Sequence, residues 1–299
     1  MKTLQDSIKY TLEKKKYQLS NKEHFFTSSN DSIVAYLKNE KSAASIALNF
    51  DFLATWDHFQ FIHFFLDSHN LEYRYLAEST ITEIEANNWY FFLGKKVDRF
   101  DSSIQFHEAI KHMAQALLLG WDTLAIKYGK LLITMLYGKQ YKGWHPIYKH
   151  PWFMLEIFCK WQNIKLDYSK LQYPENMEVY KEVIDNWDTE SISLLSTLVN
   201  KLVDFHIAQS DEYVTTDEYG NEESSDFSSS DYFIYAVEIL LWLNIRSRMG
   251  LPEYTPNNEL MKLSINNWRT IKSEVPVIGL IDNAKAKLLK DYQGFEFEI

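Results

Sequence analysis

Residues 103–138 repeat apolar side chains at intervals of three and four, and this spacing most restricts what the chain can fold into. In SSIQFHEAIKHMAQALLLG the apolar stripe comprises Phe106, Ile110, Met113 and Leu117. The stripe predicts one face of an α-helix packed against a core, because 3.6 residues complete a helical turn. Gly120 ends this segment, and WDTLAIKYGKLLITMLYG follows at once, from the capping residue Asp122 to Gly138. The two segments predict an antiparallel pair of helices.

The same periodicity runs through most of the chain, so we predict an all-α protein. Further helices are expected to begin near Pro151 in HPWFMLEIFCKWQ, near Pro174 in YPENMEVYKEVIDNW, and at Asp188 or Thr189. DYFIYAVEILLWLNIRSRMG is expected to be a helix that ends at Gly250. Nine glycines and six prolines are too few for the many tight turns of an all-β sandwich or barrel.

The domain organisation is predicted from the helical segments and from the spacing of tryptophans. We expect an N-terminal helical region over residues 1–100 and a C-terminal helical domain over 101–299, or both packed as one continuous unit. Trp121, Trp152 and Trp187 lie 31 and 35 residues apart, a spacing similar to that of stacked helical hairpins. The predicted architecture is therefore a compact or solenoid-like stack of antiparallel hairpins.

An acidic stretch, residues 210–231, lies between two strongly apolar segments and contains no lysine or arginine. Its eight acids are Asp211, Glu212, Asp217, Glu218, Glu222, Glu223, Asp226 and Asp231. They account for most of the formal net charge of −10, so the negative field is localised. The Ser, Thr, Asn and Gly content predicts a loop. This loop would be longer than most connections between helices. Two interpretations stay open: a solvated linker, or a surface that attracts a basic partner.

Composition and charge exclude several other classes of protein. A nucleic-acid binder needs clustered lysine and arginine to neutralise phosphates, whereas the charges outside residues 210–231 sum to about neutral, so nucleic-acid binding is not expected. The best membrane candidate, YFIYAVEILLWLNI, has fourteen residues and contains Glu238, so it is too short to cross a bilayer. MKTLQDSIKYTLEKKK lacks the apolar run of a signal peptide, and we expect a cytoplasmic protein. The single cysteine, Cys159, excludes an intramolecular disulfide and is expected to be a buried apolar residue.

The segment HEAIKH contains His107, Glu108 and His112 and is similar to a metalloprotease helix. Two zinc-binding histidines on one helix need a separation of four residues, whereas a separation of five turns the second about 140° from the first. We therefore predict no metal site, and we identify no catalytic or cofactor-binding residue. The histidines of DHFQFIHFFLDSH lie among phenylalanines, which predicts an aromatic core helix.

Glu238 lies among apolar residues in YAVEILLWLNIR and needs a partner, because burying an unpaired carboxylate is costly. Arg246 and Arg248 follow about two turns later, too far for a direct pair, so we expect a partner from elsewhere in the fold. A structural ion pair is a better interpretation here than catalysis. His206 follows Asp204 by two residues, which points the two side chains apart on a helix, and His206 is predicted to be structural.

Three segments, in this order, resemble all-α immunity proteins of bacterial polymorphic-toxin systems: HPWFMLEIFCKWQ, VYKEVIDNWDTESISLLSTLVNKLVDFHIAQS and DYFIYAVEILLWLNIRSRMGLPEYTPNNELM. The resemblance is to the immunity protein 49 family, with the PoNi-type immunity proteins as neighbours, and it covers residues 100–262. It implies a protein without catalytic residues that neutralises a toxin by binding its active domain. Such toxins are delivered by contact or by secretion, for example by type VI secretion. GLPEYTPNNELM departs from the His-Pro-Leu-Met ending of the relatives.

Charge and resemblance together predict a cytoplasmic inhibitor whose partner is a cognate toxin with a basic active-site surface. A nuclease is one such toxin, because it must be basic to hold phosphates, and the eight acids of residues 210–231 are the candidate contacts. We expect no cofactor and no interaction with nucleic acid or membrane. The alternatives are a helical-hairpin scaffold or adaptor for another protein, and a helical metal-dependent enzyme built on His107, Glu108 and His112.

Overall fold

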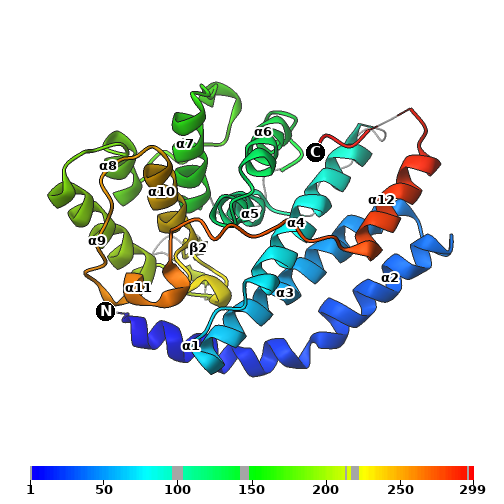
Figure 1. The fold of residues 1–299 in the computed structure, drawn as a ribbon, viewed down its shortest axis with the longest axis horizontal. Helices are drawn as coiled ribbons and strands as arrows, with labels where there is room; N and C mark the ends of the chain where they lie inside the picture. Colours follow the sequence, from blue (N-terminus) through cyan, green and yellow to red (C-terminus); the bar gives the residue numbers. More distant parts are fainter. Residues whose placement is uncertain (1, 96–103, 142–147, 213, 217–221, 295) are drawn as a thin grey trace.

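The computed structural model describes residues 2–95, 104–141, 148–212, 214–216, 222–294 and 296–299 (Figure 1). Within these ranges the chain folds into twelve α-helices and one short β-hairpin, which confirms the predicted all-α fold. The helices are α1 (Leu4–Ser20), α2 (Ser28–Leu37), α3 (Ile46–Ser68), α4 (Tyr73–Gly94), α5 (Phe106–Leu118), α6 (Asp122–Tyr137), α7 (His150–Gln162), α8 (Val179–Asp185), α9 (Ile192–Ala208), α10 (Val237–Arg248), α11 (Glu259–Lys262) and α12 (Gly279–Asp291). None of these described helices combines the length and the apolar character needed to cross a membrane.

The two longest helices, α3 and α4, pack side by side through the centre of the molecule (Figure 1). α3 buries phenylalanines on several of its sides, as its sequence predicted. Trp89 of α4 lies between Tyr36 and Phe50, with ring-centroid distances of 5.7 and 5.4 Å. Its indole N–H donates to the carbonyl oxygen of Ala43 at 3.0 Å. This buried indole therefore fixes α4 against α2 and the entry to α3.

The N-terminal and C-terminal regions share one hydrophobic core. Buried apolar residues form a continuous cluster from Ile33 to Leu288. The C-terminal helix α12 packs against α2, and Figure 1 shows these two helices side by side at one end of the molecule. The side-chain amide of Asn88 on α4 donates to the backbone oxygen of Ile299 at 2.5 Å. The two predicted regions thus pack against each other as one unit in the described residues.

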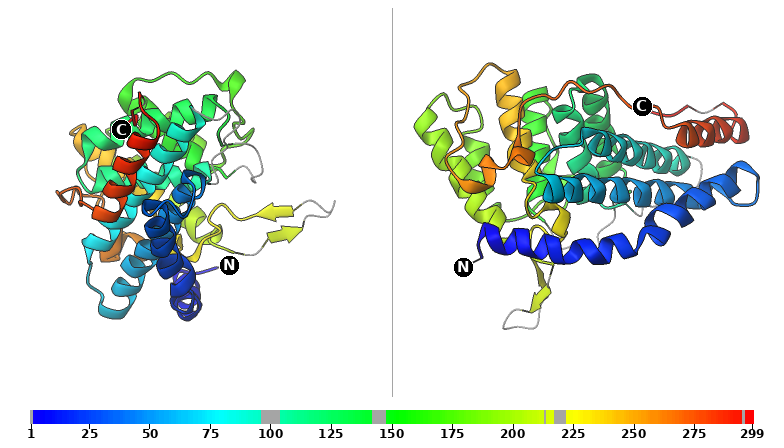
Figure 2. Two further views of the ribbon diagram at one scale, coloured as in Figure 1. Left: turned by 90° about the vertical axis from the view of Figure 1, so that its right-hand side faces the viewer. Right: turned by 60° about the horizontal axis from the view of Figure 1, so that its bottom comes forward.

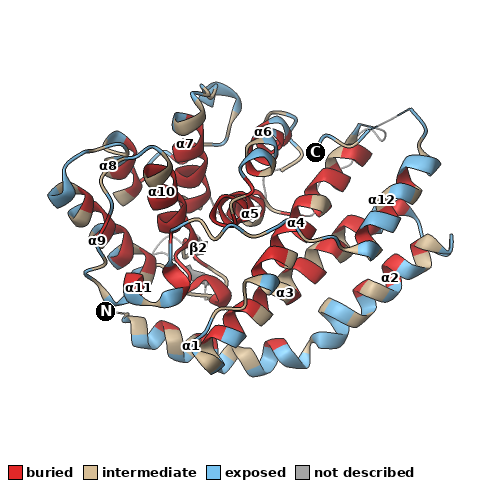
Figure 3. Cartoon of the chain, in the orientation of Figure 1, coloured by how far each residue is buried: buried red, intermediate tan, exposed pale blue. Residues whose placement is uncertain are grey.

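α5 lies at the centre of the other half, where α4, α6, α7 and α10 pack around it. Figure 3 shows that α5 and α10 are buried almost throughout, whereas α1 and α2 expose one side. Close packing requires a glycine at position 129 of α6. A Cβ there would lie 2.4 Å from Cζ of Phe158 on α7, a distance that real contacts do not reach.

The C-terminal end of α5 is closed by a strap from later in the chain. The backbone N–H of Ile271 donates to the carbonyl of Leu118 at 2.8 Å, and that of Ser273 donates to Leu119 at 2.9 Å. Arg248 donates to the carbonyl of Leu117 at 2.6 Å. These bonds satisfy carbonyl groups that have no partner within the helix. These bonds fix the C-terminal end of α5, and the first turns of the helix line a cavity.

Helix α9 begins later than the sequence predicted. Its cap is Ser191, whose hydroxyl accepts a backbone N–H of the first turn at 3.3 Å, rather than Asp188 or Thr189. The buried Arg246 gives a reason. Its guanidinium donates to the carbonyl oxygens of Trp187 and Thr189 at 2.9 and 2.8 Å. These two carbonyl groups are therefore bonded to Arg246 instead of to backbone N–H groups of a helix.

Candidate functional site

The acidic stretch contains a short β-hairpin. β1 (Val214–Thr216) pairs antiparallel with β2 (Glu222–Ser224). Figure 2 shows the two strands projecting away from the helical body. We call residues 214–224 the acidic arm. Asp217 and Glu218, which the sequence predicted as partner contacts, lie outside the described residues.

Phe227 anchors the base of the acidic arm to the body. Its backbone N–H donates to the carbonyl of Gln209 at 3.1 Å, and its own carbonyl accepts from Asp211 at 3.0 Å. Its ring is 1% exposed and packs against the imidazoles of His150 and His206, with centroid distances of 4.6 and 4.2 Å. The segments that lead into and out of the hairpin are therefore bonded to each other and packed against the core through Phe227.

Asp226 is buried, so the expectation of a solvated acid does not hold for it. Its carboxylate accepts the backbone N–H groups of Lys149 and His150 at 2.5 and 2.9 Å, at the start of α7. It also accepts the hydroxyl of Tyr180 at 3.2 Å. Burial alone would raise the pKa of Asp226, but His150 and the two N–H groups outweigh it and lower that pKa. Asp226 thus accepts, from a distant segment, two N–H groups at the N-terminus of α7, an end that favours a negative charge.

Asp231 is also buried and likewise departs from the expected loop. It lies in the 3₁₀-helix Ser230–Tyr232, with Oδ2 3.3 Å from Nε2 of His58. The hydroxyl of Ser229 donates to the same carboxyl group. Burial raises the pKa of Asp231 to about 6. This acid belongs to the interior of the protein.

Asp211 and Glu212 are compensated by α1. Asp211 lies 3.7 Å from the ammonium of Lys2, and Glu212 lies 2.5 Å from that of Lys14. Glu212 also accepts the hydroxyl of Tyr10 at 3.0 Å. Both acids are partly exposed, so each pair adds little stability. Their charges are nevertheless locally neutralised.

The eight acids thus divide into two groups of four. The body holds Asp211, Glu212, Asp226 and Asp231 through the contacts above. The acidic arm carries the remaining four in its sequence, and two of them, Glu222 and Glu223, lie on β2. Four of the eight acids predicted to create a localised negative field are therefore held by the body of the protein.

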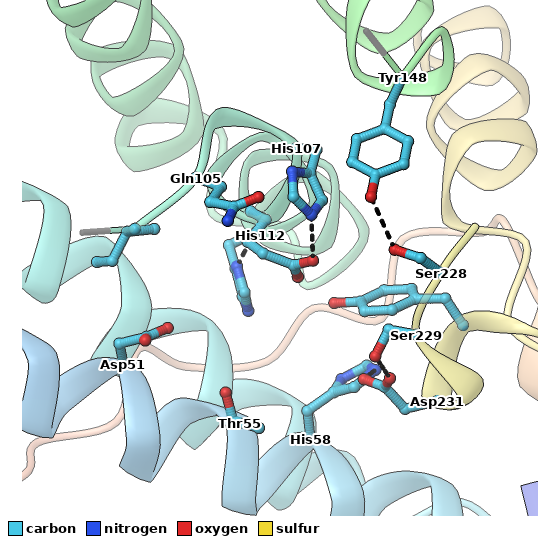
Figure 4. A pocket seen from close by; sticks show the side chains of 13 residues that line it. Asp51, Thr55, His58, Gln105, His107, His112, Tyr148, Ser228, Ser229 and Asp231 are labelled. Atoms are coloured by element: carbon cyan, nitrogen blue, oxygen red, sulfur yellow. Dashed lines mark hydrogen bonds and ion pairs between the residues drawn. The ribbon is translucent and has the colours of Figure 1, made fainter. Parts of the chain in front are cut away.

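A cavity of about 420 Å³ opens at the foot of the acidic arm (Figure 4). Its walls come from α3, from the start of α5 and from the segment that follows β2. It is lined by Asp51, Thr55, His58, Ile104, Gln105, His107, Glu108, His112, Tyr148, Ser228, Ser229, Asp231 and Tyr232. Thr55, Gln105 and Ser228 are only half-buried, so the cavity communicates with solvent. Its lining is predominantly polar.

His107 and His112 line this same cavity, although the spacing of five places them on different sides of α5. Nε2 of His107 lies 2.9 Å from Oε1 of Glu108, which the ammonium of Lys111 approaches at 3.2 Å. Within the described ranges, no three His, Cys, Asp or Glu side chains are placed so that they could hold a metal ion. The imidazole rings of His107 and His112 thus both border the cavity, but they are not directed at one shared position between them.

Burial and neighbouring charged or hydrogen-bonding groups decide the protonation of the side chains around the cavity. It lowers the pKa of His58 to about 3 and that of His112 to about 4, and it also lowers the pKa of His107. Burial would raise the pKa of Glu108, but Lys111 and His107 outweigh it and hold that pKa well below the usual range. Near neutral pH these histidines are therefore uncharged and Glu108 is ionised.

Asp51 of α3 and Glu83 of α4 form a carboxyl pair in which Glu83 is buried and Asp51 is partly exposed. Burial raises the pKa of both, that of Asp51 to about 7, and the nearby Glu108 adds to the effect at each. The charge of Asp51 raises the pKa of Glu83 further. A hydrogen bond between the two side chains favours the ionised form of Asp51 and the protonated form of Glu83. The amide of Asn87 donates to Oε1 of Glu83 at 3.1 Å. At least one proton is thus held by the pair at neutral pH.

Replacing Asp51 by Asn is expected to change how stability depends on pH. The pKa of Asp51 is raised in the folded state, so its favourable contribution is complete below about pH 4 and is lost as pH rises toward 7. The variant lacks this loss, so its unfolding free energy should improve relative to wild type between pH 5 and pH 8. Urea unfolding at the two pH values measures the difference. An unchanged difference between the two proteins would contradict the assigned pKa of Asp51.

The partner expected for Glu238 is His206 of α9. Nδ1 of His206 lies 2.9 Å from Oε1 of Glu238, and its Nε2 lies 3.1 Å from the carbonyl oxygen of Tyr232. Both side chains of the pair are at most 1% exposed. Both ring nitrogens of His206 thus face acceptor atoms of other segments. The pair joins α9 to α10 beneath Phe227.

Sequence reasoning missed Asp51, Thr55 and Tyr232 as parts of a polar cavity, since none of them stands in a recognisable motif. It identified His107, Glu108 and His112 but rejected them as metal ligands. Comparisons with protein-family models, curated proteins and solved structures found no significant match.

Proposed function

We propose that this chain is a cytoplasmic immunity protein that binds a bacterial toxin and covers its active domain. The observation that carries the proposal is the acidic arm, which projects from a packed helical body (Figure 2). An inhibitor benefits from such a feature, because concentrated charge of one sign steers a partner of the opposite sign.

The charges of the arm and of the body favour this interpretation over a plain linker. Four acids of the stretch are paired or buried in the body, and the four of the arm carry no basic residue between them. A negative field of this kind attracts a basic surface. A toxin that cleaves nucleic acid needs a basic surface to bind the phosphates of its substrate. A nuclease with a basic active-site cleft is therefore the proposed class of partner.

The two remaining candidates have less support. A scaffold or adaptor also exposes a binding surface, but a concentrated negative arm has no particular use in a neutral interface. A metal-dependent enzyme built on the α5 histidines lacks a metal-binding arrangement among the described residues.

Co-expression tests the proposed function. The product of the gene immediately upstream is expressed in a laboratory bacterium with this chain, without it, or with an unrelated acidic protein. We expect growth arrest without the chain, and restored growth only when the chain is present. Purification of the two products as one complex would support direct binding. Arrest that persists despite equal expression of the chain would contradict an immunity function for this gene pair.

A further inference from the structure

Asp51, Thr55 and His112 point into the cavity from two helices that face each other (Figure 4). Asp51 and Thr55 are one turn apart on α3, and His112 reaches the same space from α5. Each of these side chains offers an oxygen or nitrogen that can accept a hydrogen bond. The shared space therefore suits a ligand that donates several.

The tautomer of His112 is fixed by its backbone contact. Its Nδ1 lies 3.2 Å from the carbonyl oxygen of Glu108, and a carbonyl can only accept, so Nδ1 carries the proton. Nε2 is then an acceptor, and Figure 4 shows it directed into the cavity. The residue is only 6% exposed, and no group in the described ranges hydrogen-bonds to Nε2. An acceptor in the cavity wall is thus left open to a donor.

Carboxyl groups outnumber cations around this space in the part of the chain that the structure describes. Asp51 comes from α3, Glu83 from α4, Glu108 from α5 and Asp231 from the 3₁₀-helix. The ammonium of Lys111 is engaged by Glu108 at 3.2 Å and lies 3.9 Å over the ring of Tyr232. It cannot also neutralise Asp51.

We propose that the cavity binds a cationic nitrogen group, an ammonium or a guanidinium, that donates to the carboxylate of Asp51 and to Nε2 of His112. The cavity volume of about 420 Å³ falls within the range typical of small-molecule sites, roughly 300–1,000 Å³. Thr55 supplies a further acceptor. The cation places a positive charge beside Asp51, and one of its N–H groups donates to Nε2 of His112.

This chemistry has two possible sources, a free amine or guanidine and the basic side chain of a protein. Ser228 and Ser229 line the cavity and follow the acidic arm, so a basic chain attracted by the arm would pass the cavity mouth. The binding site itself does not rest on the proposed function, because its acceptors belong to the body of the protein.

The test compares methylguanidinium with methylurea, which has the same shape and no charge. The whole chain, labelled with ¹⁵N-histidine, is titrated with each compound and followed by nuclear magnetic resonance. We expect methylguanidinium to bind at least tenfold more tightly and to shift the Nε2 signal of His112. Equal affinities for the two compounds, or no shift at His112, would overturn the proposal.

Two variants and a control locate the binding group. Asp51→Asn is expected to remove the preference for methylguanidinium, and Thr55→Val to weaken binding severalfold. Glu259→Gln, a change at an exposed acid of α11, should leave the affinity unchanged. Lowering the pH from 8 to 6 should also weaken binding, because Asp51, which faces Glu83 and Glu108, then takes up a proton. An Asp51→Asn protein that folds normally and retains the preference would contradict the site.

The source is distinguished by two larger probes. Agmatine represents a free guanidine, and acetyl-Gly-Arg-Gly-amide represents an arginine in a polypeptide. Binding of agmatine alone would support the cation site with a small metabolite as its ligand. Binding of the peptide as well would support a protein side chain. Failure of both, in a protein that is folded, would overturn the proposal.

Discussion

Neutralising the acidic arm should slow association with the toxin that we propose as the partner by about 10- to 100-fold at low salt. The substitutions are Asp217→Asn, Glu218→Gln, Glu222→Gln and Glu223→Gln. Charges at the rim of an interface act mainly on the association rate, and the Debye length of ~8 Å at physiological salt screens them. The difference between variant and wild type should therefore shrink as salt is added. Surface plasmon resonance at two salt concentrations measures it.

A matched control separates the local field of the arm from net charge. Neutralising four exposed acids elsewhere changes the total charge by the same amount; suitable positions are Glu190, Glu259, Glu274 and Asp282. This control should associate almost as fast as wild type. Both quadruple variants should unfold at nearly the wild-type denaturant concentration, because exposed charges usually change stability by about 0.5 kcal/mol or less. Equal association rates for the arm variant and wild type, at both salts, would leave the arm as a solvated hairpin.

The helices were predictable because their signals are local. Pro151 lies in the first turn of α7, and α10 ends two residues before Gly250, which has the left-handed φ of 70° expected after a helix. The start of α8 was wrong, since Pro174 precedes it by five residues. The start of α9 was also wrong, because contacts with the distant Arg246 decide it. Such contacts cannot be derived from a local pattern.

The interior role of Asp226 and Asp231 could not be derived from their neighbours in sequence. Both stand in a run of polar residues that is typical of a solvated loop. Their burial depends on Phe227, which packs between two histidines from α7 and α9. A single aromatic residue within an acidic run was the available signal, but its packing partners lie 77 and 21 residues away in the chain.

The α5 cavity shows the limit of a motif argument. The separation of His107 and His112 argues against a shared zinc ion, and that argument concerns one helix alone. The same residues became parts of a polar cavity only when α3 placed Asp51 and Thr55 opposite them. Which side chains meet across two helices is decided by tertiary packing, and no spacing within either helix reveals it.

By contrast, Glu238 and His206 were each noticed in the sequence, but as separate residues. A carboxylate among apolar residues predicts that a partner exists and does not identify it. The structure supplies the identity, because α9 and α10 bring the two side chains to 2.9 Å in a site that solvent does not reach. The expected partner from elsewhere in the fold is confirmed by this contact.

Replacing Glu238 by Ala is expected to lower the free energy of unfolding by about 3–5 kcal/mol, because removing one member of a buried pair leaves the other without compensation. His206 would keep one acceptor, the carbonyl of Tyr232, and lose the other. Urea unfolding followed by circular dichroism measures the change. Glu259→Ala, at an exposed acid that pairs only with a neighbour on its own helix, is the control and should change stability by about 0.5 kcal/mol or less.

A double variant distinguishes the charge effect from lost packing. His206→Phe combined with Glu238→Leu replaces both polar partners by apolar groups, a change that is often neutral in buried pairs. We therefore expect the double variant to be more stable than Glu238→Ala alone, since no polar group is left unpaired. If the double variant loses as much stability as the sum of the two single changes, the pair contributes through the shape of its side chains rather than through its hydrogen bond.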